Sequence, residues 1–448
     1  MSHDARGIAT RCGLLALVVR LAVVAVAAGR LPPVDDATYY QIVAERIAQG
    51  LGYTWAWPDG TVTFAANYPV GYPALLGALY VVTGARPVVA MVLNAVVGAA
   101  ATYAGVLLVS RAATRRGALL AGLVVALEPA LVLYTPALMT EAFAGELAVV
   151  GAAVATAPRW NYGVRVVGSG LVCGVATLVR PELLLFAPFV GALVHFRAPA
   201  LRRVLLAALA VTAVAFAVCL PWTARNCARL DRCAFVSANA GQNLLIGTSP
   251  LGKGGWVGLD RMGVPAECRS EFGEGGKDRC FGRAARRIIR ADAPAWLALV
   301  PAKLAMTFNY GTAAAYYLST SNPALVGERA KLGIGALELL GQRVVLVLAA
   351  AALARLPGPR RRLRRVVAVA CGMLALSPPA WLAFLLLVLE GALVGRSLLR
   401  MPAAWLGVGA VAVTALTHAV FFGAGRYALV CLPAVAVLSG MLCPDRKD

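Results

Sequence analysis

The chain has 448 residues, of which 60% are hydrophobic and only 14% charged, and its formal net charge is +21. This composition is too apolar for an ordinary soluble protein, and several apolar runs approach the ~20 residues that span a bilayer. Much of the arginine lies in short gaps between those runs, as at 111–116, 197–203 and 355–365. Such gaps are typical of the cytoplasmic loops of a multi-pass membrane protein, and they argue against nucleic-acid binding.

Counting the crossings with the basic gaps on the cytoplasmic side predicts an all-α polytopic membrane protein with about twelve transmembrane helices. The expected crossings lie near 13–30, 87–109, 117–136, 141–157, 165–179, 182–196, 203–221, 336–354, 366–379, 380–395, 403–422 and 427–443. The first run also has features of a cleaved signal peptide. Arg20 inside that run, and the many runs after it, favour an uncleaved first helix.

The crossings divide the chain into three predicted regions. Residues 1–221 form an N-terminal transmembrane module, residues 222–335 one larger outer-face loop region, and residues 336–448 the C-terminal transmembrane helices. The first outer loop, 31–86, carries an acidic pair and an amphipathic helix with apolar residues at helical spacing. Residues 71–84 within that loop are too short to cross and are expected to form an interfacial or re-entrant helix.

Four of the ten cysteines, at positions 227, 233, 268 and 280, fall in the larger outer region. An oxidising exterior permits the bridges Cys227–Cys233 and Cys268–Cys280, although four cysteines allow three pairings. The cysteines and histidines of the sequence lack zinc-ligand spacing, so a structural zinc site is not expected.

Carboxylates gather at the predicted outer ends of the crossings. Asp35 and Asp36 directly follow the first apolar run, and Glu141 stands at another outer end. A carboxylate that is partly removed from water is a better base, so all three are candidate catalytic residues. The alternative for the pair is that one aspartate caps the helix that follows, which leaves the other free.

Cationic side chains gather at the same ends. Arg180, Arg225 and Arg426 are candidates to hold the phosphate of a donor, because guanidinium groups bind phosphate oxygens in a fixed geometry. The alternative for each arginine is snorkelling at the interface or a salt bridge to a nearby acid. Lys303 is a further phosphate candidate, with the anchoring of a helix end as its alternative role. Candidate substrate contacts are the nearby aromatic and amide side chains Tyr39, Tyr72, Asn226, Asn239 and Tyr427.

Several motifs of this chain occur in the order seen in bacterial multi-span glycosyltransferases. They are "DDATYYQIVAERIAQGLGY", "NYPVGYPALLGALY", "LEPALVLYTPALMTEA", "RPELLLF", "PWTARN", "SANAGQNLLIGTSP" and "GRYALVCLPAVAVL". This order resembles the GT-C superfamily and is similar to protein O-mannosyltransferases and lipid A aminoarabinose transferases. The resemblance covers most of the chain, and it is carried by the order and placement of the motifs together.

The resemblance implies a membrane glycosyltransferase that takes a sugar from a polyprenyl-phosphate donor. It implies transfer with inversion to an acceptor hydroxyl or amine of a lipid, glycan or protein, on the outer face of the plasma (inner) membrane. The first-loop acid of the family matches Asp35, as general base, and the second-loop acid matches Glu141, in a supporting role. The family's Pro-Pro-Gly-Tyr-Pro motif reads Pro-Val-Gly-Tyr-Pro at 69–73 here.

Two alternatives remain open. No metal is expected, because arginines can stabilise the leaving phosphate, but Mg²⁺ or Mn²⁺ bridging Asp35 or Asp36 and Glu141 is the alternative. The alternative function is a transporter or flippase of lipid-linked sugars. A visible internal repeat is lacking and the charges gather on one side, and both features argue against transport.

Overall fold

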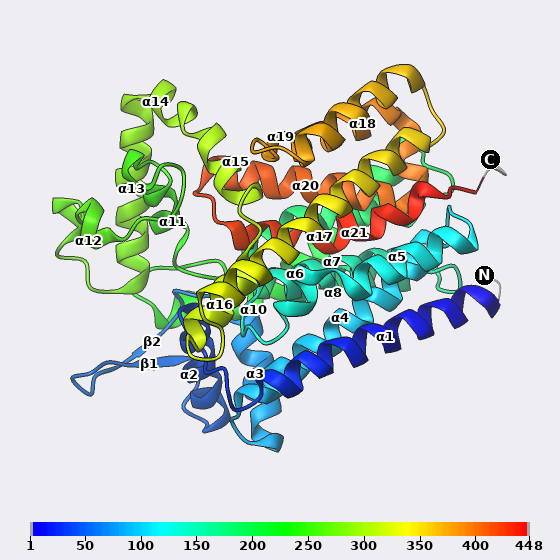
Figure 1. Ribbon diagram of the computed structural model, residues 1–448. Helices are drawn as coiled ribbons and strands as arrows, with labels where there is room; N and C mark the ends of the chain where they lie inside the picture. The colour runs from blue at the N-terminus through cyan, green and yellow to red at the C-terminus, as the bar shows by residue number, and fades with distance from the viewer. Residues whose placement is uncertain (1–2, 446–448) are drawn as a thin grey trace.

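The computed structural model describes residues 3–445, so residues 1–2 and 446–448 of the predicted end regions lie outside the described part (Figure 1). The described chain is almost entirely helical, with one two-stranded sheet. Both ends of the chain lie at one end of the helical bundle, and the two strands lie at the other (Figure 1). The predicted all-α class is confirmed.

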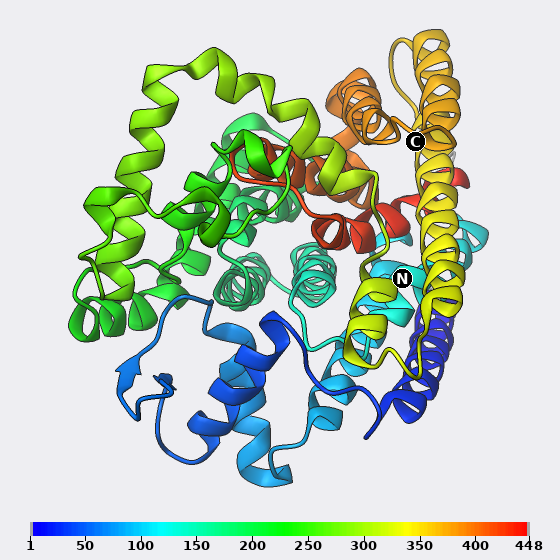
Figure 2. The ribbon, with the colours of Figure 1, turned by 60° about the vertical axis from the view of Figure 1, so that its left-hand side comes forward.

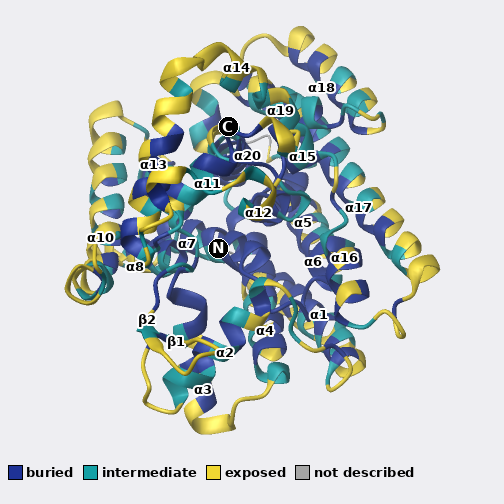
Figure 3. Cartoon of the chain, turned by 90° about the vertical axis from the view of Figure 1, so that its left-hand side faces the viewer, coloured by how far each residue is buried: buried dark blue, intermediate teal, exposed yellow. Residues whose placement is uncertain are grey.

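Seven helices in residues 3–445 are long and apolar enough to cross a membrane. They coincide with predicted crossings and are α1 (His3–Ala27), α4 (Pro87–Val109), α8 (Tyr162–Val179), α10 (Leu201–Arg229), α17 (Glu328–Arg355), α19 (Trp381–Val394, continued by η5, Gly395–Arg400) and α20 (Pro402–Val420). Helix α10 exposes Leu205, Leu209 and Phe216, and Figure 3 shows exposed outer and buried inner helix faces. Apolar outer faces suit contact with lipid, as a multi-pass membrane protein requires.

The other five predicted crossings are shorter or interrupted helices. They are α5 (Arg115–Leu127) with α6 (Pro129–Leu133); α7 (Glu141–Ala155); η1 (Pro181–Phe186), α9 (Ala187–Ala192) and η2 (Leu193–His195); α18 (Arg361–Ala375); and η6 (Gly425–Val430), α21 (Leu432–Leu438) and η7 (Ser439–Leu442). Prolines begin α6 and η1, where the missing N–H ends the preceding helix. The predicted break at 377–379 is confirmed, because it separates α18 from α19. The total of about twelve crossings stays a prediction.

Helix α10 is longer than the crossing predicted at 203–221, because it continues past Pro221 to Arg229. Proline removes one backbone N–H, yet the side chains after it find partners in the returning chain. The indole of Trp222 donates to the Val236 carbonyl (3.0 Å), and the hydroxyl of Thr223 donates to the Phe235 carbonyl (2.7 Å). These bonds hold the last turns of α10 in place beyond the proline.

The first outer loop folds into α2 (Asp36–Ala48), a hairpin of β1 (Thr54–Ala56) and β2 (Val62–Phe64), and α3 (Gly71–Thr83). Helix α3 has 13 residues, too few to cross a membrane, as predicted. Helices α2 and α3 pack closely at Gly77, where a Cβ atom would lie only 2.7 Å from the side chain of Ile47. The strands are antiparallel, with Trp55 opposite Thr63.

The larger outer region is more ordered than the predicted loop. Its helices are α11 (Ala240–Ile246), η3 (Pro250–Gly252), α12 (Leu259–Met262), η4 (Ala266–Cys268), α13 (Glu274–Ala291), α14 (Ala293–Ala298), α15 (Val300–Phe308) and α16 (Ala313–Ser321). Leu245 and Phe281 form a small core around the Cys268–Cys280 disulfide, and the Cys227–Cys233 disulfide also forms. Figure 2 shows this region, in green to yellow, beside the blue first outer loop.

Candidate active site

Five charged side chains from four stretches of the chain meet beside the start of α2. We call them the charged cluster: Asp36, Glu141, Arg180, Glu182 and Arg426. Asp36 and Glu141 are the first residues of α2 and α7, Arg180 follows the end of α8, and the remaining two lie in η1 and η6. All except Glu182 are site residues predicted from the sequence.

Arg426 connects two carboxylates of the charged cluster. Its Nη2 lies 2.7 Å from Asp36 Oδ2, and its Nε lies 3.3 Å from Glu141 Oε1. Arg180 contacts the same Glu141 oxygen through Nη1 at 3.0 Å and Glu182 through Nε at 2.5 Å. The Glu141 side chain is 1% exposed, whereas that of Arg426 is 31% exposed. Glu141 is therefore a buried anchor, and Arg426 is a cation within reach of a ligand.

Aromatic side chains surround the charged cluster. The hydroxyl of Tyr68 donates to Asp36 Oδ1 (2.6 Å), and that of Tyr134 donates to Glu141 Oε2 (3.2 Å). Burial and the Asp36 carboxylate raise the pKa of Tyr68, so its hydroxyl stays protonated and remains a donor. The ring of Tyr427 lies 5.3 Å from the Arg180 guanidinium and 5.5 Å from that of Arg426. These contacts fix the orientation of the charged groups.

Asp35 differs sharply from its neighbour Asp36. It is exposed, it makes no side-chain cap hydrogen bond to α2, and it takes part in no ion pair within the described chain. Its backbone has φ 52° and ψ −130°, a conformation that costs a non-glycine residue about 1–3 kcal/mol. The protein itself leaves the Asp35 side chain exposed, so the expectation that Asp35 is partly removed from water depends on the membrane surface. Of the pair, Asp35 is the free acid, and Asp36 is held by Arg426 and Tyr68.

The surrounding chain holds Asp35 in this strained conformation. The hydroxyl of Ser321 donates to the Pro32 carbonyl (2.6 Å), and the amide of Asn322 donates to the Arg30 carbonyl (2.9 Å). Both donors come from the end of α16. They lie 289 and 292 residues later in the chain than the carbonyls they bind. Strain that is maintained from a distant segment is typical of functional positions.

Two predicted ligand-binding residues on α10 contact backbone carbonyls. Arg225 donates to the Tyr53 carbonyl (2.7 Å) and the Ala65 carbonyl (2.8 Å), and its guanidinium lies 4.6 Å from the Trp222 ring. Asn226 is fully buried and donates to the Ala234 carbonyl (3.2 Å). The structure therefore uses Arg225 to hold the base of the hairpin. It separates both residues from the charged cluster.

Two more predicted residues are occupied by structural contacts. Lys303 is buried, and its Nζ lies 3.3 Å from the Ala419 carbonyl and 3.2 Å from the Val420 carbonyl. These carbonyls end α20, so the lysine serves the alternative role of anchoring a helix end. Tyr72 is fully buried and donates to Asn94 Oδ1 at 3.1 Å, which leaves it inaccessible to a substrate.

The other predicted substrate contacts lie in three different places. Tyr427 packs against the charged cluster, and His418 stacks on its ring at 4.2 Å. Tyr39 lies one turn into α2, stacked on Trp55 at 4.8 Å and close to Tyr68 at 4.7 Å. Asn239 precedes α11 and accepts a hydrogen bond from Ser237 (3.0 Å).

Tyr68 and Tyr134 contact the charged cluster but were not among the predicted site residues. Both stand in motifs that carry the family resemblance, at "NYPVGYP" and "LVLYTPALMT". Both tyrosines could have been identified by their position close in sequence to a predicted site acid or motif. Apolar periodicity does not mark either position as a site residue. A tyrosine on a buried helix face fits the same pattern without contacting a site.

The cation between the acids is an arginine. In residues 3–445, His, Cys, Asp and Glu side chains form no group of three or more that is suited to a metal ion. The Arg426 guanidinium occupies the position between Asp36 and Glu141 that a bridging metal would take. In this structure those two acids are therefore bridged by a guanidinium.

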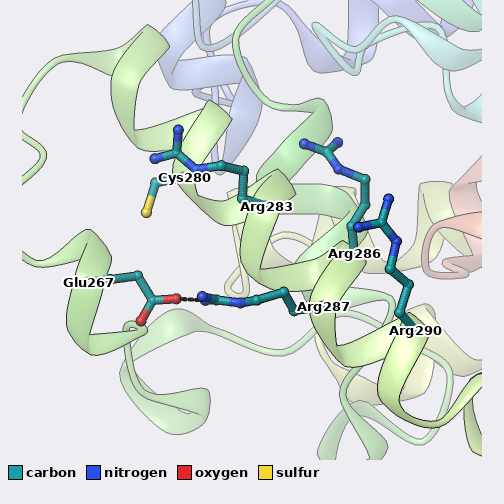
Figure 4. Close-up of a pocket in the computed structure, with 6 residues that line it drawn as sticks. All are labelled: Glu267, Cys280, Arg283, Arg286, Arg287 and Arg290. Atoms are coloured by element: carbon teal, nitrogen blue, oxygen red, sulfur yellow. Dashed lines mark hydrogen bonds and ion pairs between the residues drawn. The ribbon is translucent and has the colours of Figure 1, made fainter.

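Two cavities lie outside the charged cluster. One, of about 250 Å³, is lined by arginines of α13 together with Glu267 (Figure 4). Figure 4 shows Glu267 facing Arg287, with which it forms an ion pair. The other, of about 330 Å³, is lined by Tyr39, Trp55 and Trp57 on one side and by polar residues on the other. We call this second cavity the aromatic cleft.

Comparison with known proteins finds no matching family model and no matching curated protein. Solved structures are similar. The oligosaccharyltransferase AglB from Archaeoglobus fulgidus, in complex with an inhibitory peptide and a dolichol-phosphate, is 13% identical with a TM-score of 0.47, over 98% of this chain and 50% of that one. ArnT from Cupriavidus metallidurans, bound to undecaprenyl phosphate, is 16% identical with a TM-score of 0.39, over 95% of this chain and 77% of that one.

This chain spans about half the length of the oligosaccharyltransferase. The identities of 13% and 16% and the TM-scores of 0.47 and 0.39 carry no substrate, partner or mechanism over to this chain.

Proposed function

We propose that this chain is a membrane glycosyltransferase that moves a sugar from a polyprenyl-phosphate donor to an acceptor on the outer face of the plasma membrane. The observation that carries the proposal is the strained, unpaired carboxylate of Asp35 next to a cluster that presents the Arg426 guanidinium. A free base beside a held cation suits a reaction that removes a proton and releases an anion. The polyprenyl carrier is taken from the sequence resemblance.

In the proposed reaction, the carboxylate of Asp35 accepts the proton of the acceptor hydroxyl or amine. The acceptor atom then forms a bond to the anomeric carbon of the donor sugar. The bond between that carbon and the phosphate oxygen breaks on the opposite side, and its electron pair stays with the phosphate. Attack opposite to the leaving group inverts the anomeric carbon, as the family resemblance implies.

Arg426 is our candidate to stabilise the leaving phosphate. Its Nη2 and Nε contact Asp36 and Glu141, which leaves Nη1 outside these ion pairs. A guanidinium that is already oriented stabilises developing negative charge without reorganising during the reaction. Arg180 is 14% exposed and bonded to two acids, so its role is to orient Glu141 and to contribute positive charge. We propose that no metal is required.

The outer location is supported by the cysteines. The disulfides Cys227–Cys233 and Cys268–Cys280 lie in the region that packs on the first outer loop. Disulfides persist in oxidising compartments outside the cytoplasm. The basic gaps between helices are then cytoplasmic, in accordance with the positive-inside rule. We also propose that the five shorter predicted crossings complete about twelve transmembrane segments.

The test is turnover of radiolabelled polyprenyl-phosphate sugars by the purified protein, with and without a chelator. We expect Asp35→Asn to lower turnover by about 10²-fold or more, because it removes the base and keeps the shape. Asp260→Asn is the matched control, because Asp260 is an equally exposed outer-region aspartate on α12. The chelator is expected to have no effect.

Full turnover by Asp35→Asn would show that Asp35 is not the base. Loss of turnover in the presence of the chelator would show that a metal, and not the arginine, stabilises the leaving phosphate. If no donor is turned over, but the protein moves a lipid-linked sugar between the leaflets of a liposome, the transporter alternative replaces the transferase.

A further inference from the structure

The aromatic cleft lies between the first outer loop and the larger outer region. Tyr39 of α2 and Trp55 and Trp57 of the hairpin line one wall, and Asn67, Gln242 and Lys277 are among the polar residues of the other. Its volume of about 330 Å³ falls in the range of ligand-binding pockets, about 300–1,000 Å³. It shares no residue with the charged cluster.

The side chains of the aromatic wall have contacts that hold them in place before any ligand binds. Trp55 and Trp57 are two residues apart at the end of β1, so their side chains lie on the same face of the hairpin. Trp55 stacks on Tyr39 with an interplanar angle of 14°. The Trp57 indole donates to the Thr63 hydroxyl (2.9 Å), and its ring remains 47% exposed. This wall offers an accessible aromatic surface that needs little ordering on binding.

The acids of the polar wall accept hydrogen bonds from the backbone. Glu274 accepts from the Ala66 N–H (2.5 Å), and Asp278 accepts from the N–H groups of Gly241 (2.7 Å) and Gln242 (3.0 Å). These bonds hold the chain after the hairpin and the start of α11 at the rim of the cleft. One oxygen of each carboxylate therefore accepts from backbone donors.

The remaining polar groups of that wall are available to a ligand. Within residues 3–445 the side chains of Asn67, Gln242 and Lys277 take part in no side-chain hydrogen bond or ion pair. Two amides and one ammonium supply neutral and charged donors and amide acceptors. A purely apolar ligand would leave these groups unsatisfied, at a cost in free energy.

This combination matches the chemistry of a sugar. A pyranose or furanose ring has an apolar C–H face, which packs on aromatic rings, and an edge of hydroxyls, which bond to amides and ammonium groups. A strongly anionic ligand fits poorly here, because one lysine faces the carboxylates of Glu274 and Asp278. The arginine-lined cavity of Figure 4 has the opposite balance of charge.

The cleft is also connected to the proposed base. Tyr39 stands four residues after Asp35, one helical turn along α2. Tyr68 lies between the cleft and the charged cluster, because its ring is 4.7 Å from that of Tyr39 and its hydroxyl donates to Asp36. The first turn of α2 therefore connects the aromatic wall with the Asp35–Asp36 pair.

We propose that the aromatic cleft binds the acceptor and that the acceptor is a saccharide, stacked on Trp55 and Trp57. The inference rests on the proposed transferase function and selects the glycan from the three acceptor classes left open. The acceptor hydroxyl that reacts belongs to a sugar at the Tyr39 end of the cleft. Its proton passes to Asp35, and its oxygen forms the bond to the donor sugar.

The test is isothermal titration calorimetry of the purified full chain with neutral di- to tetrasaccharides of glucose, mannose, galactose, arabinose and N-acetylglucosamine. The protein is kept in a detergent without a sugar headgroup, so that the detergent does not compete. We expect at least one saccharide to bind, and Trp57→Ala to weaken its binding tenfold or more. Trp160→Ala is the matched control, because Trp160 is 48% exposed but lies between α7 and α8, outside the cleft.

The inference is overturned if no saccharide of the panel binds at millimolar concentration, or if Trp57→Ala and Trp160→Ala bind it equally. It is also overturned if Trp57 is needed only for binding of a peptide panel run in parallel. Binding is measured without a donor, so it is independent of turnover. Saccharide binding without donor turnover would overturn the transferase, and with it the acceptor role, and would leave a saccharide-binding cleft. Turnover without saccharide binding would overturn the acceptor inference alone.

Discussion

Two adjacent aspartates show how the structure separates identical residues. Asp36 accepts from Arg426 and Tyr68, whereas Asp35, one position earlier, has a strained backbone and no such partner. Arg426 is 390 residues away from Asp36 in the chain. The first acid is therefore suited to proton transfer and the second to orienting a cation, although their chemistry in isolation is the same.

The role of Arg426 predicts a cost for a conservative change. Arg426→Lys keeps the positive charge but loses the planar fork that reaches Asp36 and Glu141 together. We expect kcat/KM for donor turnover to fall about tenfold or more, because charge-assisted hydrogen bonds contribute about 1.5–3 kcal/mol. Steady-state kinetics of the purified variant measures this. Arg396→Lys, at an exposed position in η5, is the control, and equal kinetics for both variants would remove Arg426 from the site.

At the scale of elements, the hairpin of β1 and β2 is positioned by a helix far along the chain. The strands have three residues each, which is too few for independent stability. Arg225 of α10 donates to backbone carbonyls on both sides of the hairpin, at Tyr53 and Ala65. The aromatic wall carried by the hairpin therefore depends on a residue outside it.

Arg225→Ala is expected to loosen the hairpin while the helical bundle stays folded. Loss of these two charge-assisted bonds should lower the local opening free energy by about 1.5–3 kcal/mol. Amide hydrogen exchange of residues 53–65 measures this opening. Arg229→Ala is the comparison, because Arg229 contacts only the Phe64 ring, at 5.0 Å, among these hairpin residues. Unchanged exchange in Arg225→Ala would contradict the anchoring role.

At the scale of the whole molecule, a buried ion pair connects the first helix to the rest of the bundle. Arg20 of α1 lies 2.9 Å from Glu146 of α7, and both side chains are 2% exposed. The same guanidinium donates to the Leu131 carbonyl (2.8 Å) and the Thr135 hydroxyl (3.1 Å). Gly98 of α4 makes room for it, because a Cβ there would lie 2.3 Å from the guanidinium carbon. Both terminal nitrogens of this arginine, which lies within an apolar helix, therefore have buried hydrogen-bond partners.

Replacing one residue of this ion pair is expected to destabilise the protein more than replacing both. Arg20→Met leaves Glu146 buried without its partner, which should cost about 3–5 kcal/mol. The double variant with Glu146→Met should recover most of the loss. Denaturant unfolding of both variants in detergent tests this. A double variant as unstable as Arg20→Met would show that the pair acts through shape and not through charge.

The sequence by itself determined the helical class and the position of most helices. Apolar runs, prolines and glycines act within a few residues, so they predict the break at 377–379, the short helix α3 and, to within one residue, the starts of α4, α19 and α20. The sequence also placed acids and arginines at the same ends of the helices. The continuation of α10 past Pro221 was not predicted, because it depends on hydrogen bonds to a loop 12 to 14 residues later.

Only the tertiary structure decided which of those charged residues meet. It brought Asp36, Glu141, Arg180 and Arg426 together and assigned Arg225 and Lys303 to backbone carbonyls elsewhere. It also gave the adjacent residues Asp35 and Asp36 different surroundings. The physical reason is that hydropathy is a property of neighbouring residues, whereas the partner of a charged side chain depends on segments that lie hundreds of residues away and become neighbours only in the folded chain.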